Sequence, residues 1–356
     1  MICPDGDGAC RQQLGNVGIL GFPYNPQPDD YGLFAMPASP ELPHRGFIAT
    51  LPLPLFASVM GTCGLAMVWH SIETRWQLMP VISASLTALA AVIFVILIGA
   101  YSLKTLNFRD RVMAELRHPV RINFLPAISI NLILLGILSR PWLEGLSDVL
   151  WLTGAGLQLL LTLSIVTVWL NTERPPNSLN PAWFIPAVGN VLVPVAAVPA
   201  GFELTGWFFF SIGVFYWIIL GTLVFYRLVT GSPLEPPMRP TLAILMAPPA
   251  VAFLAWLQLG DGLGSAGLML YFIAVLNFLL LLPQIPGFLR LPFFPSWWAY
   301  TFPLAAFTTA SFRFDSLTGA FGDVLLALLA GLVTIVIVTV AGRTLLAVFR
   351  GELAAH

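Results

Sequence analysis

Residues 181–200 read PAWFIPAVGNVLVPVAAVPA, an apolar run that Pro186, Pro194 and Pro199 interrupt and that contains no ionisable side chain. About 20 predominantly apolar residues are enough for a helix to cross a bilayer. A proline inside such a helix removes one backbone hydrogen bond and leaves a carbonyl group free. In hydrocarbon that carbonyl must be satisfied by protein or by a water-lined cavity. The run therefore predicts a bent spanning helix that lies inside a bundle, away from lipid.

Nine further segments are long and apolar enough to span, and proline alternates among the ten. The segments are 50–70, 80–103, 122–139, 149–170, 182–200, 204–227, 241–259, 263–282, 296–312 and 321–342. Even-numbered segments have no internal proline. Odd-numbered segments carry Pro52 and Pro54, Pro126, Pro186 with Pro194 and Pro199, Pro248 and Pro249, and Pro303. We therefore expect bent odd-numbered helices inside the protein and straight even-numbered helices facing lipid.

Composition places the chain in the same class. Hydrophobic residues make up 58% of the sequence and charged residues 9%, and the mean hydropathy is +0.86. A soluble globular domain of this length does not have such a composition. The net charge of −1 gives no indication of a nucleic-acid partner, and we expect none. The sequence predicts an all-α polytopic membrane protein in the lipid bilayer.

The basic residues predict the orientation of the spans. Thirteen of the 16 Lys and Arg residues lie in the N-terminal part or after even-numbered segments, whereas Arg75, Arg140 and Arg313 follow odd-numbered ones. Loops rich in Lys and Arg stay in the cytoplasm. Both termini are therefore expected to be cytoplasmic, which agrees with the even number of spans, because that number places the termini on the same side.

The chain divides into three parts. We expect residues 1–47 to be a disordered cytoplasmic tail, 48–350 to form the ten-helix transmembrane domain, and 351–356 to be a short cytoplasmic tail. Cys3, Cys10 and Cys63 match no metal-ligand spacing, so neither a metal nor a cofactor is predicted. The sequence has no nucleophile motif, phosphate loop or buried cluster of His and carboxylates, so an enzyme is not predicted.

Proline spacing suggests an internal repeat. Pro54, Pro126, Pro186, Pro248 and Pro303 are separated by 72, 60, 62 and 55 residues, which leaves room for one bent and one straight helix in each interval. Five helical hairpins that enter from the same side predict a quasi-five-fold ring of bent inner helices around a central pore.

Four motifs resemble one known family. They are HPVRINFLPAIS at 118–129, NPAWFIPAVGN at 180–190, RPT at 239–241 leading to APPA at 247–250, and WWAYTFP at 297–303. In this order, over residues 48–350, they resemble the tellurite-resistance/dicarboxylate transporter family, which includes bacterial tellurite-resistance protein A, yeast malate permeases and the slow-type anion channels of plant guard cells. The resemblance implies ten helices, a central pore in each protomer, a homotrimer, and a multi-pass protein of the plasma (inner) membrane.

The resemblance also implies a gate. In the family a phenylalanine just before the ninth-helix proline blocks the pore, and the matching residue is Phe302. The other pore-lining candidates are Phe56, Ala57, Ser129, Asn190, Pro248, Pro249, Thr301 and Pro303. Helix kinks are expected at Pro126, Pro186, Pro194, Pro248 and Pro303.

Two structural alternatives stay open at these positions. Ser129 and Asn190 could equally satisfy backbone groups freed by the neighbouring prolines. The family often has a proline in the middle of its first helix, but this chain has Val59 and Met60 there. Gly61 and Gly64 could supply a bend at that point or a close helix contact.

The transported species follows from the neutral spans. A proton-coupled carrier usually has an intramembrane acid or histidine, and no ionisable side chain lies in the middle of any predicted span. We therefore expect a gated channel for small monovalent anions, with nitrate passing more easily than chloride. The alternative is a secondary carrier of malate-like dicarboxylates or tellurite-related oxyanions, with or without coupling to protons.

Overall fold

The computed structural model describes residues 47–173, 178–260 and 262–350. The predicted tails, with Cys3 and Cys10, lie outside these residues apart from Phe47. All regular secondary structure in the described part of the chain is helical. This agrees with the predicted all-α class.

Among the residues that the structure describes, eight helices are long and apolar enough to cross a membrane. They are Leu53–Arg75, Val81–Asn107, Arg121–Ser139, Glu144–Asn171, Glu203–Thr230, Pro236–Leu259, Gly264–Leu289 and Asp323–Phe349. Two further segments fall where the sequence predicted spans. Pro181–Ala197 is a shorter apolar helical run. The run Pro295–Tyr300 with Thr301–Thr318 is also helical, but it includes the charged Arg313 and Asp315 and is not among the eight.

The proline-containing segments share one construction, in which a 3₁₀ stretch passes into an α-helix. The pairs are η2 (Leu53–Phe56) with α3 (Ala57–Arg75), η3 (Arg121–Phe124) with α6 (Ala127–Ser139), η6 (Gly189–Leu192) with α9 (Val193–Ala197), η7 (Pro236–Met246) with α11 (Ala247–Leu259), and η9 (Pro295–Tyr300) with α14 (Thr301–Thr318). The fifth predicted span also includes η5 (Pro181–Trp183) and α8 (Phe184–Val188) ahead of η6. A 3₁₀ stretch within a longer helix often marks a functional hinge or strain.

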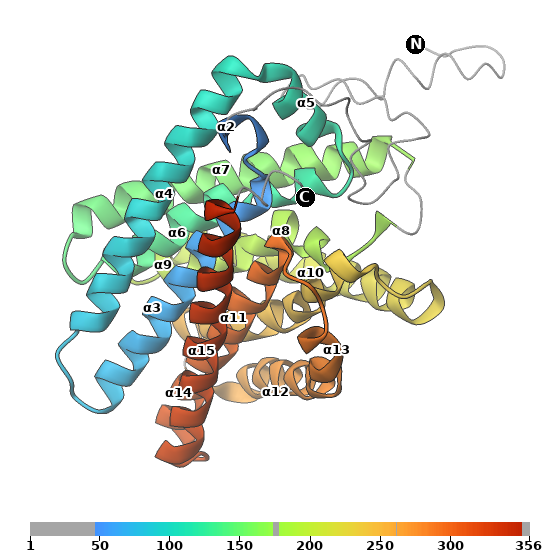
Figure 1. Cartoon of the computed structure of the whole chain (residues 1–356). Helices are drawn as coiled ribbons and strands as arrows, with labels where there is room; N and C mark the ends of the chain where they lie inside the picture. Colours follow the sequence, from blue (N-terminus) through green and yellow to red (C-terminus); the bar gives the residue numbers. More distant parts are fainter. Residues whose placement is uncertain (1–46, 174–177, 261, 351–356) are drawn as a thin grey trace, which may run out of the picture.

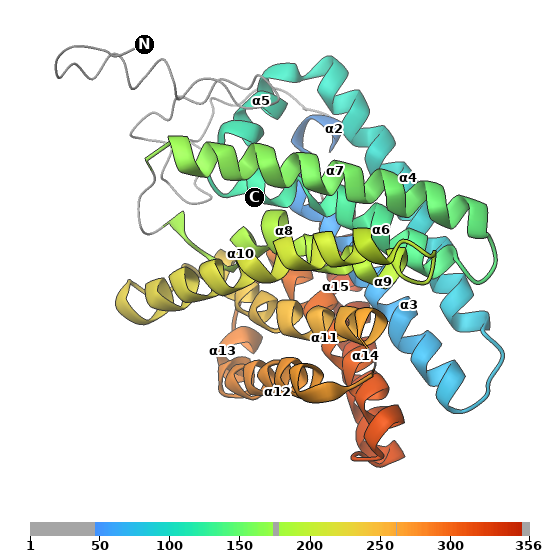
Figure 2. The same ribbon diagram turned by 180° about the vertical axis from the view of Figure 1, so that it is seen from behind.

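The other spans are long α-helices, continuous in four cases and followed by a 3₁₀ turn with Pro283 in the fifth. They are α4 (Val81–Asn107), α7 (Glu144–Asn171), α10 (Glu203–Thr230), α12 (Gly264–Leu281), which η8 (Leu282–Gln284) and α13 (Ile285–Leu289) extend, and α15 (Asp323–Phe349). Two shorter helices, α2 (Phe47–Thr50) and α5 (Arg109–Arg117), lie near the end of α4 (Figures 1 and 2).

Burial separates these two groups. In Leu53–Arg75 and Arg121–Ser139 the most apolar stretch is 72% buried, whereas in Val81–Asn107 and Gly264–Leu289 it is 22% and 17% buried. The exposed side chains of the second group are large and apolar, including Val95, Ile96 and Met269. Such a surface matches a hydrocarbon environment rather than water. The difference agrees with inner proline-containing helices and outer straight ones.

The buried helices follow one another in a closed series. α3 contacts α6, α6 contacts α9, α9 contacts α11, α11 contacts α14, and α14 returns to α3. The last hairpin, α14–α15, therefore packs beside the first one (Figure 1).

Gly61 and Gly64 provide the close contact that closes this series. A Cβ on Gly61 would lie 2.3 Å from Oγ1 of Thr301, and one on Gly64 would lie 2.7 Å from Cβ of Ala305. Any side chain here would force α3 and α14 apart. α3 runs as one α-helix from Ala57 to Arg75. Of the two predicted roles of Gly61 and Gly64, a bend or a close helix contact, the structure therefore shows the close contact.

Candidate functional site

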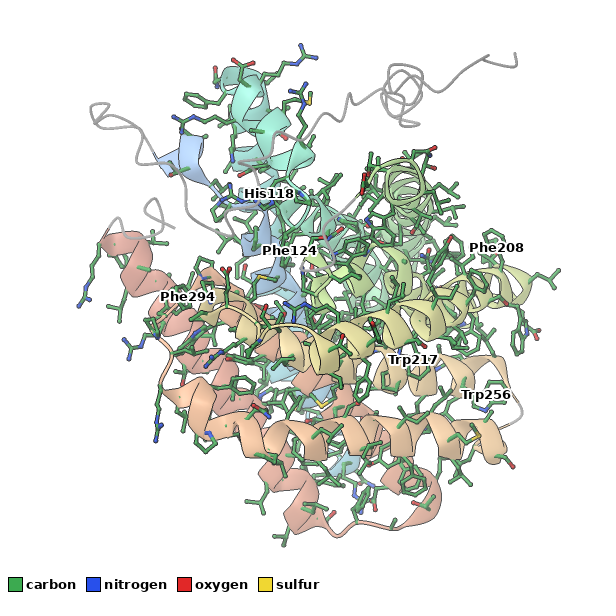
Figure 3. All side chains as sticks on the ribbon, turned by 90° about the vertical axis from the view of Figure 1, so that its right-hand side faces the viewer. His118, Phe124, Phe208, Trp217, Trp256 and Phe294 are labelled. Carbon is green, nitrogen blue, oxygen red and sulfur yellow. The ribbon has the colours of Figure 1, made fainter. Side chains whose placement is uncertain are left out.

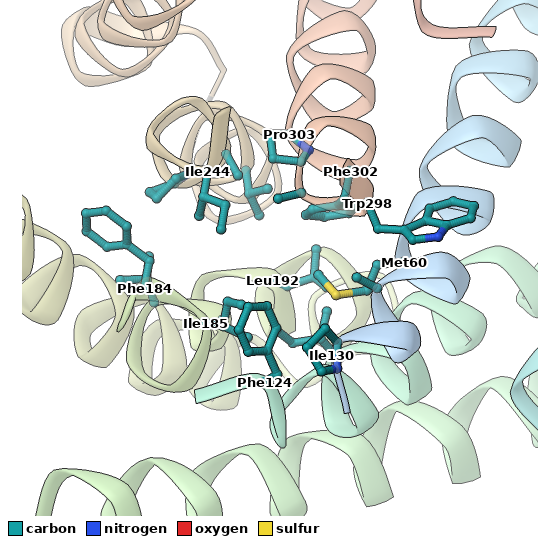
Figure 4. Close-up of a pocket in the computed structure, with 18 of the residues that line it drawn as sticks. Met60, Phe124, Ile130, Phe184, Ile185, Leu192, Ile244, Trp298, Phe302 and Pro303 are labelled. Carbon is teal, nitrogen blue, oxygen red and sulfur yellow. The ribbon is translucent and has the colours of Figure 1, made fainter. Parts of the chain in front are cut away.

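A cavity of about 90 Å³ lies between the proline-containing segments. All five segments contribute to its wall (Figure 4). The lining residues are Pro54, Ala57, Met60, Phe124, Ile130, Phe184, Ile185, Val188, Gly189, Val191, Leu192, Ile244, Ala247, Pro248, Val251, Pro295, Ser296, Trp298, Ala299, Phe302 and Pro303. One ordered water needs roughly 10–15 Å³ on this measure. The cavity is therefore large enough for a small anion.

The wall of this cavity is neutral and mostly apolar. None of its lining residues is ionisable, and the one hydroxyl belongs to Ser296. That hydroxyl donates to the carbonyl oxygen of Pro237, and the indole N–H of Trp298 donates to Oγ1 of Thr344 at 2.9 Å. These two donors are therefore already occupied and do not offer a fixed anion site.

Phe302 extends from α14 toward Leu192 and Met60 (Figure 4). Its side chain is 8% exposed, and Pro303 follows it on the cavity wall. A Cβ on Gly64 would lie 3.5 Å from Cδ2 of Phe302, which is ordinary van der Waals contact. The Phe302 ring thus lies beside Gly64, at the contact between α3 and α14.

The structure brings four predicted site residues together and leaves five outside the cavity wall. Ala57, Pro248, Phe302 and Pro303 line the cavity. Phe56, Ser129, Asn190, Pro249 and Thr301 are buried but are not among the lining residues. For these five, a place on a conducting path stays a prediction.

The prolines at the predicted kinks lie near the starts of helices, and Pro303 is the third residue of α14. Pro126 is the N-cap of α6, and Pro194 and Pro248 lie in the first turns of α9 and α11. Pro186 lies within the five-residue helix α8. Proline is tolerated in a first turn because the N–H it lacks would have no partner there.

A polar network satisfies the backbone of the most interrupted segment. Gln158 on α7 is fully buried, and its Nε2 donates to the carbonyl oxygens of Pro186 at 2.8 Å and Ile185 at 3.3 Å. Thr162, one turn further along α7, also donates to the Pro186 carbonyl, at 2.7 Å. Asn190 donates through Nδ2 to the Ala187 carbonyl at 2.7 Å and to Oγ1 of Thr162 at 2.9 Å.

Ser129 belongs to the same network. Its hydroxyl lies 2.8 Å from the Pro126 carbonyl and 2.6 Å from Oε1 of Gln158. Of the two alternatives left open by the sequence, Ser129 and Asn190 therefore satisfy backbone groups beside prolines. Gln158 and Thr162 were not among the predicted site residues; the available signal was a glutamine in the middle of a predicted span.

The segment before α6 forms one end of the cavity wall through Phe124. His118 accepts hydrogen bonds at Nδ1 from the backbone N–H groups of Val120 and Arg121, at 3.2 and 3.3 Å. This turn starts η3, which carries Phe124 to the cavity. His118 and Phe124 lie in the same region of the molecule, below α5 (Figure 3).

A buried ion pair holds the backbone just before η2, the first of the five segments that line the cavity. Lys104, which is 1% exposed, lies 2.8 Å from Oε1 of Glu115 and donates to the carbonyl oxygen of Leu51 at 2.7 Å. Tyr101 donates to Oε2 of the same carboxylate at 3.1 Å. Leu51 lies two residues before η2, which supplies Pro54 to the cavity. In the sequence, Lys104 lies just after the predicted span 80–103 and is one of the 13 basic residues that predict the orientation.

At the other end of α3, charged side chains join helix ends. Glu73 accepts from the backbone N–H groups of Ile82 and Ser83 at the start of α4, at 2.8 and 3.1 Å, and from the Ser83 hydroxyl. Arg75 lies 3.4 Å from buried Asp315 and 3.0 Å from Asp323. These contacts fix α3 to the helices beside it.

Eight apolar helices, buried proline-containing segments and a neutral cavity between them define a multi-pass membrane protein of the channel or transporter class. Residues 50–345 match the family described as voltage-dependent anion channel, SLAC1, and the chain belongs to this family. The match confirms the resemblance drawn from the four proline motifs, and the relatives of this chain include both plant anion channels and a tellurite resistance protein homolog.

Three relatives illustrate these two kinds of protein, plant anion channels and a tellurite resistance protein homolog. The chain is 28% identical over 313 residues to the S-type anion channel SLAH2 of Arabidopsis thaliana, which covers 85% of this chain and 60% of the relative. It is 24% identical over 305 residues to the guard cell S-type anion channel SLAC1 of the same plant, covering 83% and 55%. It is 27% identical over 267 residues to a tellurite resistance protein TehA homolog of Haemophilus influenzae, covering 74% and 81%. The chain thus spans about half to three fifths of the length of these plant relatives.

Proposed function

We propose that this protein is a gated anion channel for small monovalent anions such as nitrate and chloride, closed by Phe302. One observation carries the proposal: the cavity touches all five proline-containing segments, has no ionisable side chain in its wall, and has Phe302 in that wall. A path between these segments would run through the cavity. Membership of the voltage-dependent anion channel family supports the anionic cargo.

The neutral wall favours conduction over tight binding. An ion leaves a pore quickly only if no site holds it strongly, and the cavity wall has no cationic side chain. An anion would exchange much of its hydration for apolar contacts there. Weakly hydrated anions lose less free energy in that exchange, so nitrate should pass more easily than chloride.

The proposed channel has ten spans in a quasi-five-fold ring. Pro181–Ala197 and the η9–α14 segment are the two spans beyond the eight long apolar helices. The closed series of contacts through α3, α6, α9, α11 and α14 supports a ring of inner helices around one path. The 13-to-3 distribution of basic residues supports cytoplasmic termini. A homotrimer in the plasma membrane rests on the family resemblance.

A carrier of dicarboxylates or tellurite-related oxyanions is the second candidate, favoured by the similarity to a tellurite resistance protein homolog. A carrier must bind its substrate at a site that alternates between the two sides of the membrane. The absence of ionisable side chains from the cavity wall favours the channel.

The test is the anion current of the wild type and of Phe302→Ala in planar bilayers, with nitrate, chloride and malate exchanged. Removal of the ring should raise conductance strongly, with a current that is linear in voltage and a reversal potential that follows the nitrate or chloride gradient. Phe278→Ala is a suitable control, because Phe278 stacks on Phe307 at a centroid distance of 4.7 Å and is not part of the cavity wall. Saturable malate uptake that needs a pH gradient, without current in either protein, would establish the carrier.

A further inference from the structure

The short helix α5 presents arginines next to the lipid-facing surface of α4. Along the last turns of α4 the apolar side chains of Leu103 and Leu106 are 48% and 79% exposed, and Phe108 is 39% exposed. Arg109 follows directly, and α5 ends at Arg117. α5 lies at the end of α4, beside α2 (Figures 1 and 2). The chain thus passes from a surface suited to hydrocarbon to a basic helix within a few residues.

The two faces of α5 differ in their contacts. Val112 and Glu115 are buried, whereas Arg109, Asp110 and Arg117 are exposed. Within the described part of the chain, neither Arg109 nor Arg117 forms an ion pair. The Arg111 guanidinium lies between the faces, 5.9 Å from the centre of the Phe108 ring. With Asp110 counted, the outward side keeps a net positive charge.

The inward face of α5 connects to the cavity. Glu115 pairs with Lys104, which also holds the Leu51 carbonyl, and Arg111 donates to the Ala49 carbonyl at 3.2 Å. Ala49 and Leu51 lie four and two residues before η2, where Pro54 lines the cavity. A displacement of α5 would therefore move the backbone that leads into the cavity wall.

We propose that the outward face of α5 binds the headgroup of an anionic phospholipid, and that the Glu115–Lys104–Leu51 contacts couple this binding to the cavity. Charge complementarity and continuity with the exposed apolar side chains at the end of α4 favour a lipid as the occupant. Lys and Arg near an anionic membrane surface each strengthen attachment severalfold. The coupling to conduction rests on the proposed channel function, whereas the lipid binding does not.

Binding is tested on the full chain in detergent by its melting temperature with dioleoylphosphatidylglycerol or dioleoylphosphatidylcholine. Phosphatidylglycerol should raise the melting temperature of the wild type, and Arg109→Gln with Arg117→Gln should need roughly tenfold more lipid for the same rise. The control is Arg313→Gln, an exposed arginine after an odd-numbered segment and so on the other side of the predicted membrane, which should respond like the wild type. Glycerol phosphate alone should give no rise, because it lacks the acyl chains that sit against α4.

Three outcomes would overturn the lipid site. They are no rise with phosphatidylglycerol in the wild type, an equal rise in all variants, and a full rise with glycerol phosphate. An acidic protein segment as the true occupant would appear as the first of these.

Coupling is tested by nitrate flux through Phe302→Ala protein in phosphatidylcholine vesicles with and without one quarter phosphatidylglycerol. Flux should depend on phosphatidylglycerol, and Arg109→Gln with Arg117→Gln should remove that dependence while the control Arg313→Gln keeps it. Lys104→Arg should retain lipid binding but reduce the dependence of flux, because a guanidinium cannot reproduce both contacts of the ammonium in the same space. If nitrate flux is the same with and without phosphatidylglycerol in every variant, although the melting temperature depends on the lipid, the coupling is refuted. No flux at all would count against the channel and leave the lipid result standing.

Discussion

Nε2 of Gln158 lies 2.8 Å from the carbonyl oxygen of Pro186, so a side chain of the straight helix α7 satisfies the backbone of the interrupted segment beside it. Backbone groups without partners are costly in an apolar environment. Proline-containing helices can remain inside this protein because neighbouring side chains replace the hydrogen bonds that the helix has lost. The outer helix thereby fixes the shape of a segment that supplies Phe184, Ile185, Val188 and Leu192 to the cavity wall.

We expect Gln158→Leu to destabilise the protein by about 1–3 kcal/mol, because the change removes the side-chain partner of Ser129 and one donor to Pro186. The melting temperature in detergent measures this effect. Thr222→Val is the control, since Thr222 is exposed on α10 and bonds only to the Ile218 carbonyl of its own helix. Equal melting temperatures for the two variants would contradict a structural role for the network.

The sequence predicts the inner and outer helices of this protein for a simple reason. Proline changes the backbone of its own segment, and its effect on where a segment can lie needs no knowledge of the neighbours. Pro126, Pro186, Pro248 and Pro303 therefore indicate the buried segments correctly. The motifs around them were also specific enough to identify the family before any fold was considered.

Partners across helices were not predictable in the same way. Gln158 and Lys104 are polar residues on helices that the prolines mark as outer, and their sequence neighbourhood does not say which helix they face. Only the packing of α7 against α8 and of α4 against α5 brings them to Pro186 and Glu115. The prediction of ten spans is confirmed only in part, for a different reason. The helix is repeatedly interrupted in Pro181–Ala197, and α14 ends in charged residues, so neither has the length and hydropathy of a simple spanning helix.

Gly64→Ala should destabilise the protein by about 1–3 kcal/mol, because the new methyl group would lie 2.7 Å from Cβ of Ala305 and push α14 away from α3. Gly99→Ala on α4 is the control, because nothing lies within 4 Å of its added Cβ. That control should be neutral or stabilising by up to about 1 kcal/mol. Thermal unfolding of the three proteins in detergent gives the comparison.

The double variant Gly64→Ala with Ala305→Gly should recover most of the lost stability, since it restores the space between the two helices. A double-mutant cycle should therefore give a favourable interaction free energy between the two positions. If the two changes simply added, α3 and α14 would not be in contact at these residues in the folded protein.

Glu115→Gln should cost about 3–5 kcal/mol of stability, because it leaves the buried Lys104 ammonium without its counter-ion. The matched control is Asp148→Asn in the Arg140–Asp148 pair, where both side chains are partly exposed. A pair of that kind contributes only about 0–1 kcal/mol. Unfolding by denaturant or heat should rank the two variants clearly, and a similar loss in both would mean that water reaches Lys104.

A negative charge in the cavity should block anions if the cavity lies on the conducting path. Val251 of α11 lines the cavity, and Val251→Asp would place a carboxylate near any anion inside it. Two unit charges about 5 Å apart at an effective dielectric constant of 20 repel by roughly 3 kcal/mol, which corresponds to roughly a hundredfold in rate. In the Phe302→Ala background, nitrate current through Val251→Asp should therefore fall below about one tenth of that through Val251→Asn, which has nearly the same shape and no charge. Both variants must be compared at equal amounts of folded protein in the bilayer. Burial in this apolar wall favours the neutral acid, so the comparison is made at pH 7 and at pH 9; equal currents at both pH values would mean that anions cross elsewhere and that the cavity beside Phe302 is only a packing defect.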